Sequence, residues 1–133
     1  VMAFPPVHRL RAAGVTVFGG NDNLRDSWWP FGDGDMLNRA NTIAYRSGFN
    51  EDWELAVAGE LVTHAGARAL GAREYGLIEG ASADFVALPA QHWPQAVAAV
   101  PRERAVYKRG RLMAQDGRLV AEVGRCRQAA VAA

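Results

Sequence analysis

Residues 15–36 read VTVFGGNDNLRDSWWPFGDGDM, an apolar run followed directly by a polar loop that is rich in turn-forming residues. The run VTVFG, residues 15–19, consists of strand-forming residues without clear polar alternation, which is typical of a parallel strand covered on both faces. The loop behind it holds four aspartates, two adjacent tryptophans and several glycine or proline breakers. Ligands of α/β proteins bind beyond the carboxyl ends of parallel strands, so this loop is the first place to expect a site.

Helical patterns lie on both sides of this loop. They are VHRLRAAG (residues 7–14), MLNRANTIAYRSG (36–48), EDWELAVAGELV (51–62) and HAGARALG (64–71). Asp35, Asn50 and Thr63 precede the last three of these segments and are predicted N-caps. Glycines end the first, second and fourth segments, as they do at many helix C-termini. The alternation of helix, strand and helix predicts an α/β fold.

Past Gly71 the pattern changes to short extended segments separated by Gly, Asp-Gly or Pro signals. These segments are YGLIEG (residues 75–80), SADFVALPA (82–90), AVYKRG (105–110) and RLMAQDGRLVAE (111–122). The pair Asp116 and Gly117 is typical of a tight hairpin. One further helix is predicted in WPQAVAAV, residues 93–100, and the ending CRQAAVAA is predicted to be frayed. The last part of the chain is therefore predicted to be a small β unit.

Composition narrows the class of protein. The 133 residues, 50% hydrophobic and 22% charged, are those of one ordinary globular domain, too short for a complete (β/α)8 barrel of about 250 residues. A net charge of +1 gives no reason to expect a nucleic-acid partner. The single Cys126 makes no internal disulfide, and no apolar run approaches the roughly 18 residues of a membrane span. We therefore expect a cytoplasmic protein without a nucleic-acid or membrane partner.

Asp22, close behind the predicted strand, is the candidate catalytic carboxylate. At this position a carboxylate can bind a hard or borderline cation and can accept a proton from a metal-bound water. Trp28 and Trp29 can supply a flat apolar wall for a planar substrate. A structural interpretation stands beside this one, because an aspartate in such a turn most often forms an Asx-turn or caps a helix. Paired tryptophans, likewise, most often pack in a core or an interface.

The remaining acids of the loop and the histidines are predicted to have structural roles. Asp26, Asp33 and Asp35 are expected to be turn and capping residues. The three histidines share no His-x-His spacing and are predicted to be surface or packing residues: His8, His64 and His92.

Three runs of the sequence resemble a known family. They are GGNDNLRDSWWPFGDGDML (residues 19–37), LVTHAGARALGAREYGLIEGASADFVAL (61–88) and VYKRGRLMAQDG (106–117). From about Pro6 to Val120 the chain is similar to the C-terminal part of the metal-dependent amidohydrolase superfamily. The run YGLIEGASADFVAL is common to many amidohydrolases, whereas the loop NDNLRDSWWPFGDGDM resembles the branch that contains cytosine deaminase and N-isopropylammelide amidohydrolase.

The resemblance implies a distorted TIM barrel flanked by a β-sandwich that is built from both chain ends. Residues 1–71 are then expected to form the end of the barrel, with VTVFG as strand eight and the helices that follow it. Residues 72–123 are expected to form part of the composite β-sandwich, and residues 124–133 a disordered tail. The expected fold class is therefore α/β, as part of a TIM-barrel amidohydrolase.

The resemblance also implies a chemistry, the hydrolytic removal of an amino group from a planar nitrogen heterocycle such as cytosine, a related pyrimidine or a triazine. One divalent metal ion, iron or zinc, activates the water in this family. Asp22 matches the aspartate after strand eight that contacts the metal and shuttles a proton to the substrate. Asn23 and Trp28 match positions that shape the substrate site. Two residues depart from cytosine deaminase, which has a histidine at the position of Asn21 and an aspartate at that of Asn23.

The other metal ligands of the family, an early His-x-His and later histidines, and its catalytic glutamate have no counterpart in this sequence. Because a catalytic metal needs three or more protein ligands, we expect this polypeptide alone to be inactive. Its expected partners are a heterocyclic small molecule and either the missing N-terminal barrel portion or further copies of itself. The alternative hypothesis is a truncated non-catalytic remnant or a small binding module, with Trp28 and Trp29 packed in a core.

Overall fold

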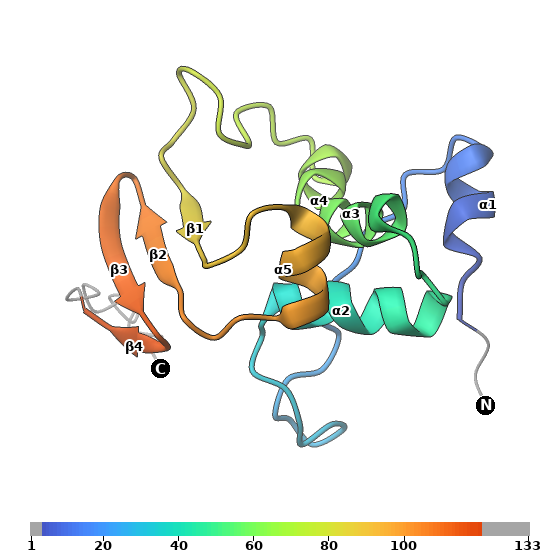
Figure 1. Ribbon diagram of the computed structural model, residues 1–133, viewed down its shortest axis with the longest axis horizontal. Coiled ribbons are helices and arrows are strands. Elements are labelled where there is room, and N and C mark those ends of the chain that lie inside the picture. Colours follow the sequence, from blue (N-terminus) through green and yellow to red (C-terminus); the bar gives the residue numbers. More distant parts are fainter. Residues whose placement is uncertain (1–3, 121–133) are drawn as a thin grey trace, which may run out of the picture.

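The computed structural model describes residues 4–120, and these form a cluster of short helices with a small sheet at one side (Figure 1). The helices are α1 (Val7–Ala12), α2 (Met36–Ser47), α3 (Asp52–Leu61), α4 (His64–Ala69) and α5 (Trp93–Ala99). The strands are β1 (Phe85–Ala87), β2 (Ala105–Lys108), β3 (Arg111–Gln115) and β4 (Arg118–Leu119). Every predicted helix is present, and the content of helix and sheet agrees with the predicted α/β class.

The start of α2 follows the sequence prediction. Asp35 is the N-cap, and its side chain accepts a hydrogen bond of 2.9 Å from the backbone N–H of Leu37. This bond satisfies one of the four N–H groups that a helix start leaves without a partner. Gly48 ends the helix with a φ of 70°, a left-handed conformation that glycine adopts without steric cost.

Of the other two predicted caps, one is wrong and one holds its position without a capping bond. The N-cap of α3 is Glu51 rather than Asn50, because Glu51 and Glu54 form a reciprocal capping box. Asn50 lies one residue earlier, where its N–H donates to Glu54 over 2.7 Å. Thr63 is the N-cap of α4, as predicted, but its side chain makes no cap hydrogen bond. Its hydroxyl instead donates back to the carbonyl of Gly59 over 2.8 Å, at the end of α3.

The segments VTVFG and YGLIEG were predicted to be extended, and neither is a strand. A strand needs a hydrogen-bonded neighbour, and no other segment among residues 4–120 pairs with either of them. Val15 and Phe18 are exposed as a result. The VTVFG segment is held at its end, where the N–H of Gly19 donates to the carbonyl of Leu61 over 2.9 Å.

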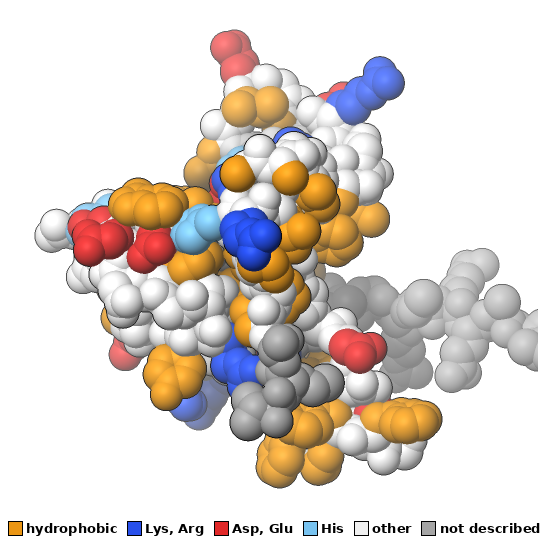
Figure 2. Space-filling model, turned by 90° about the vertical axis from the view of Figure 1, so that its right-hand side faces the viewer, with side chains coloured by type: hydrophobic (Ala, Val, Ile, Leu, Met, Phe, Trp, Pro, Cys, Tyr) orange, Lys and Arg blue, Asp and Glu red, His pale blue; other side chains and the backbone are white. Residues whose placement is uncertain are grey.

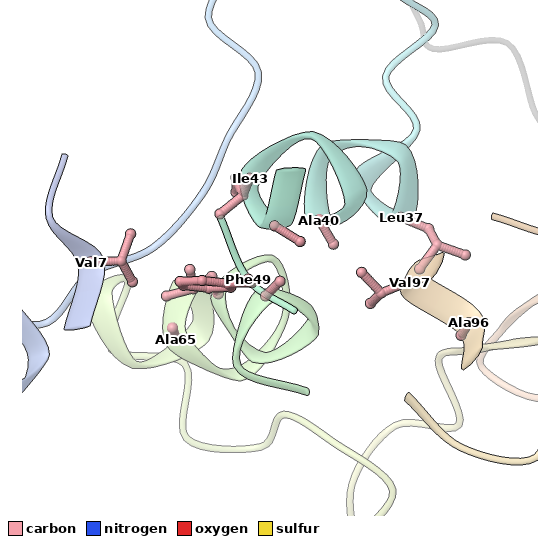
Figure 3. Packing of buried hydrophobic residues seen from close by; sticks show 11 residues of the cluster. Val7, Leu37, Ala40, Ile43, Phe49, Ala65, Ala96 and Val97 are labelled. Carbon is pink, nitrogen blue, oxygen red and sulfur yellow. The ribbon is translucent and has the colours of Figure 1, made fainter. Parts of the chain in front are cut away.

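The helices share one hydrophobic core. The buried members of this cluster are Val7, Leu37, Ala40, Ile43, Ala44, Phe49, Ala58, Leu61, Ala65, Ala96 and Val97. In Figure 3, Val97 of α5 points toward Leu37 and Ala40 of α2, while Phe49 lies among α1, α2 and α4. Helices α3 and α5 pack closely at Gly59, where an added Cβ would come within 2.6 Å of the Trp93 ring. Small residues in α2, α3 and α5 therefore allow these helices to approach one another.

The sheet is antiparallel with strand order β1-β2-β3-β4. Phe85 of β1 lies opposite Tyr107 of β2, and the two rings stack with centroids 4.6 Å apart. The predicted hairpin is confirmed, since β3 and β4 are joined at Asp116 and Gly117, both with positive φ. No strand residue of the described part belongs to the buried core, so the sheet adds little to the interior.

The predicted frayed ending, including Cys126, lies outside the described residues. The division into a barrel part and a sandwich part stays a prediction. Among residues 4–120, no helix is long and apolar enough to cross a membrane.

Candidate active site

The loop of residues 20–35 leaves the helical cluster after Gly19 and returns at the start of α2, and it hangs below α2 in Figure 1. Its aromatic side chains are exposed, and Trp28 keeps 83% of its surface accessible. Trp29 and Phe31 meet edge to face with ring centroids 5.4 Å apart. The lower part of Figure 2, at the height of this loop, shows hydrophobic side chains gathered at the surface. The alternative that both tryptophans pack in a core is therefore wrong for the described residues.

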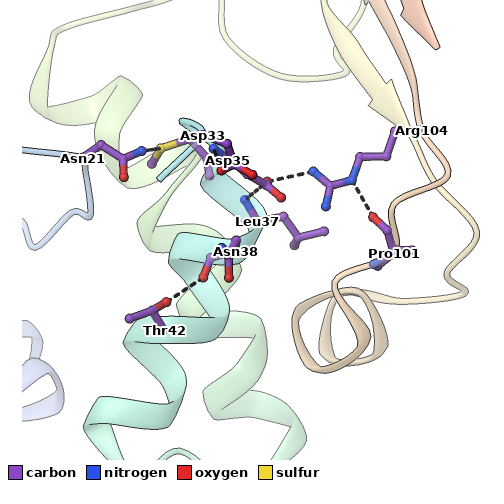
Figure 4. Close-up of polar contacts among 9 residues, drawn as sticks. Asn21, Asp33, Asp35, Leu37, Asn38, Thr42, Pro101 and Arg104 are labelled. Carbon is purple, nitrogen blue, oxygen red and sulfur yellow. Dashed lines mark hydrogen bonds and ion pairs between the residues drawn. The ribbon is translucent and has the colours of Figure 1, made fainter. Parts of the chain in front are cut away.

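Both ends of the loop are tied to the first turns of α2. At the first end, Asn21 accepts a 3.1 Å hydrogen bond from Nε of Arg39 and donates to the sulfur of Met36. At the other end, Asp35 caps the helix and forms an ion pair of 2.7 Å with Arg104 (Figure 4). Polar contacts, rather than burial, therefore hold the ends of the loop in place.

Arg104 connects the loop to the segment that leads into β2. Its guanidinium binds Asp35, and its Nε donates to the carbonyl of Pro101 over 2.6 Å. Burial alone would raise the pKa of Asp35, but the hydrogen bond and the charge of Arg104 outweigh it, so the pKa lies below its usual value. Arg104 lies 69 positions from Asp35 in the chain, and nothing in the sequence pattern indicated this pair.

A tight turn in the middle of the loop is organised by Asp26. Its Oδ1 accepts hydrogen bonds of 2.9 Å from the backbone N–H groups of Trp28 and Trp29. Its Oδ2 accepts a hydrogen bond of 2.8 Å from the side-chain amide of Asn23. The bond from Asn23 is the main reason that the pKa of Asp26 is lowered. Asp26 is therefore the turn residue that the sequence predicted, and it also connects the two candidate substrate residues.

The end of the loop is also a series of turns, as predicted. Asp33 accepts a 3.0 Å hydrogen bond from the N–H of Asp35. Gly32 has a φ of 97°, and a Cβ there would come within 3.0 Å of Leu24. Nε of Arg25 donates to the carbonyl of Gly32 over 2.8 Å. The closed shape of the loop thus depends on a glycine in a conformation that other residues rarely adopt.

Asp22 is exposed at the surface of this loop and does not lie in the packed interior. Within residues 4–120, no group of three or more histidines, cysteines or acids is placed to hold a metal ion. A catalytic iron or zinc site needs ligands from several elements, so Asp22 alone does not fit a bound metal. The described residues can therefore contribute one ligand to such a site but cannot form it.

The histidines do not contribute to this loop, and their predicted packing or surface roles are confirmed. His8 stacks on Phe49 with ring centroids 4.5 Å apart and lies 3.1 Å from a carboxylate oxygen of Glu54. His64 meets the edge of the Tyr75 ring. His92 is the N-cap of α5, a role that the sequence analysis missed although a proline follows shortly after it.

The chain belongs to the amidohydrolase family, whose model matches residues 1–121. Members of this family are hydrolases that act on C–N bonds, and their fold is of the TIM-barrel type. Over 106 residues, 79% of this chain, it is 34% identical to N-isopropylammelide isopropyl amidohydrolase of Pseudomonas sp. (strain ADP). The match spans 26% of that relative.

Solved structures agree with this assignment. One is N-isopropylammelide isopropylaminohydrolase from Burkholderia multivorans ATCC 17616, with 50% identity and a TM-score of 0.82 over 87% of this chain and 30% of that chain. Another is 5-methylcytosine deaminase from Klebsiella pneumoniae liganded with 5-fluorocytosine, with 28% identity and a TM-score of 0.75 over 89% of this chain and 28% of that chain. The branch predicted from the loop sequence is confirmed, and the chain spans less than a third of the length of each of these relatives.

Proposed function

We propose that this chain acts as the C-terminal segment of a hydrolase that removes an amino or alkylamino group from a planar nitrogen heterocycle. The proposal rests on the loop of residues 20–35, which carries Asp22, Asn23 and the exposed ring of Trp28 close together in the sequence. Hydrogen bonds such as that from Asn23 to Asp26 hold the shape of this loop. Identity of 50% to the isopropylammelide enzyme, against 28% to the cytosine enzyme, favours a triazine over cytosine as the substrate.

In this proposal three residues have separate roles. Asp22 takes a proton from the attacking water and returns it to the heterocycle, the general acid-base role for which an exposed carboxylate at the end of a loop is suited. Asn23 binds the polar edge of the ring, and Trp28 offers its face for stacking. An iron or zinc ion, held mainly by ligands of a barrel portion, would supply the activation of the attacking water.

The remaining metal ligands would come from a barrel portion that supplies the strands beside VTVFG. Two observations support this partner. No described segment pairs with VTVFG, whose Val15 and Phe18 side chains are exposed, and the chain matches only a limited share of each relative. A self-standing binding module is favoured less, because it would keep its tryptophans in a core. Sedimentation of the chain with and without a barrel portion separates these two views.

A hybrid enzyme tests the function. In it, this chain replaces the matching segment of the Burkholderia multivorans enzyme, and amine release is measured with N-isopropylammelide, cytosine and 5-methylcytosine. We expect activity on N-isopropylammelide and a loss of about a hundredfold or more on Asp22→Asn. The matched control is Asp33→Asn, a turn residue of the same loop, which should leave most activity intact. A folded, metal-loaded hybrid without activity, or an active Asp22→Asn variant, would contradict the proposal.

A further inference from the structure

We propose that Asp26 is a positioning residue that fixes which end of the Asn23 carboxamide faces the substrate. With its NH2 group directed at Asp26, Asn23 turns its carbonyl oxygen away from that carboxylate, and the site favours heterocycles that offer an N–H donor to this oxygen. This inference rests on the proposed function and adds a determinant of specificity to it.

The geometry leaves Asn23 little choice of orientation. Oδ2 of Asp26 lies 2.8 Å from Nδ2 of Asn23, and Oδ1 already accepts the N–H groups of Trp28 and Trp29. An ionised carboxylate can only accept hydrogen bonds, so the donor end of the carboxamide must face it. An aspartate is ordinarily ionised at neutral pH, and the hydrogen bond from Asn23 lowers the pKa of Asp26 further. The carbonyl oxygen of Asn23 therefore points away from Asp26, and a ligand that approaches from that side meets a hydrogen-bond acceptor.

The contact between Asn23 and Asp26 bears on one difference between this sequence and cytosine deaminase. Cytosine deaminase has an aspartate at the position that matches Asn23. An aspartate carboxylate only accepts hydrogen bonds, whereas an amide can in general both donate and accept them. Because Asp26 engages its donor end, Asn23 offers the same kind of group as an aspartate, a hydrogen-bond acceptor. Planar heterocycles in their lactam form carry a ring N–H beside a carbonyl, and they match this acceptor. Asp26 also holds the backbone of Trp28, so the acceptor and the stacking ring are set by one carboxylate.

Asp26→Asn separates orientation from folding. The introduced carboxamide can still accept the N–H groups of Trp28 and Trp29 through its oxygen, so the turn is kept. Its NH2 group would then meet the NH2 group of Asn23, and Asn23 must rotate to present its donor end outward. In the hybrid enzyme we expect KM for N-isopropylammelide to rise by about tenfold or more, because a donor then faces a donor, with a smaller change in kcat.

The double variant Asn23→Asp with Asp26→Asn restores an outward acceptor, with the hydrogen bond between the two positions reversed. We expect it to recover KM to within a few-fold of the unmodified hybrid. An unchanged KM in Asp26→Asn would overturn the proposal. A double variant no better than the single one would overturn it as well, because the loss would then come from the turn and not from the orientation of Asn23.

A readout that needs no activity uses the 133-residue chain labelled with 15N. We expect the side-chain NH2 resonances of Asn23 to be shifted by the carboxylate of Asp26 and to lose this shift in Asp26→Asn. The N–H groups of Trp28 and Trp29 should stay protected in Asp26→Asn and lose protection in Asp26→Ala. Asn23 resonances that do not respond to Asp26→Asn would overturn the inference, whether or not the hybrid is active. An inactive hybrid with the expected resonances would count against the proposed function only.

Discussion

The helical cluster and the loop of residues 20–35 lie next to each other and are stabilised in opposite ways. In the cluster, Leu61 keeps 1% of its surface exposed and Val97 none. In the loop, Trp28 keeps 83% exposed, and the chain is held by Asn21, Asp26 and Asp35 through hydrogen bonds and an ion pair. Burial of apolar surface dominates folding free energy, whereas exposed polar contacts contribute little each. The difference indicates that the cluster carries the stability of the chain and the loop carries the shape of the candidate site.

The largest effect is expected in the cluster. Leu61→Ala removes one of the most completely buried side chains and should lower the free energy of unfolding by about 2–5 kcal/mol, through lost burial and the cavity left behind. The control is Leu70→Ala, whose side chain is 84% exposed and whose loss should change stability by less than about 0.5 kcal/mol. Urea denaturation measures both. Equal effects for the two variants would show that the cluster does not form the core.

A smaller loss is expected where α3 and α5 touch. Gly59→Ala places a methyl group within 2.6 Å of the Trp93 ring, which must move, and overpacking of this kind costs about 1–3 kcal/mol. Gly66→Ala in α4 is the matched control, because no atom lies within 4 Å of the added Cβ. That variant should be stabilised slightly, since alanine favours a helix by up to about 1 kcal/mol over glycine. Thermal unfolding that ranks the two variants in the opposite order would contradict this helix contact.

Substitutions where the loop joins the cluster are expected to lower the free energy of unfolding by a smaller amount. Asp35→Ala removes the N-cap of α2 and the ion pair with Arg104, and loss of a cap costs about 0.5–2 kcal/mol. Asp35→Asn keeps a capping oxygen and loses only the charge, so it should cost less than Asp35→Ala. If urea denaturation gave the same loss for both, the ion pair rather than the cap would be the main contribution.

The small sheet offers a test by pH. The side chain of Lys108, followed by the N–H of Arg109, lowers the pKa of Asp84 to about 2 from its ordinary 3.8. A lowered carboxyl pKa adds stability above the unfolded value, and this contribution is lost as the pH falls from about 4 toward 2. The stability difference between the unmodified chain and Asp84→Asn should therefore shrink over that range in urea denaturation at several pH values. A constant difference would show that the ion pair with Lys108 does not form.

The smallest effect on stability is expected in the loop itself. Trp28→Ala removes an exposed ring and should change the free energy of unfolding by less than about 0.5 kcal/mol, although the same change should impair substrate binding in the hybrid enzyme. Thermal unfolding and KM measured on the same variant check both statements. A strong loss of stability would show that Trp28 packs against the protein, and the contrast between the two regions would fail.

Local patterns of the sequence predicted the helices well and the strands less well. Asp35, Gly48 and the Asp116–Gly117 turn act within a few residues of their own position, so their roles follow from local rules of capping and turn formation. Residues 15–19 have the composition of a strand, but a strand exists only beside a partner, and no described segment supplies one. The cap of α3 was misassigned by one residue because Glu51 and Glu54 form a capping box that excludes Asn50 from the cap position.

For the candidate site, too, local sequence indicated some of the features and the tertiary structure was needed for the others. The sequence by itself indicated the loop, with Asp22 and Trp28 as candidates, because residue types and their order are local properties of one segment. The resemblance of the same segment to the family added Asn23. Only the tertiary structure brought Arg104 to Asp35 and Arg39 to Asn21, and only it showed that Asp26 binds the side chain of Asn23 and the backbone of Trp28. The two arginine contacts join positions 69 and 18 residues apart, which meet only when the helices have packed. The Asp26 contacts are local, but they depend on side-chain distances and directions that a sequence pattern does not give.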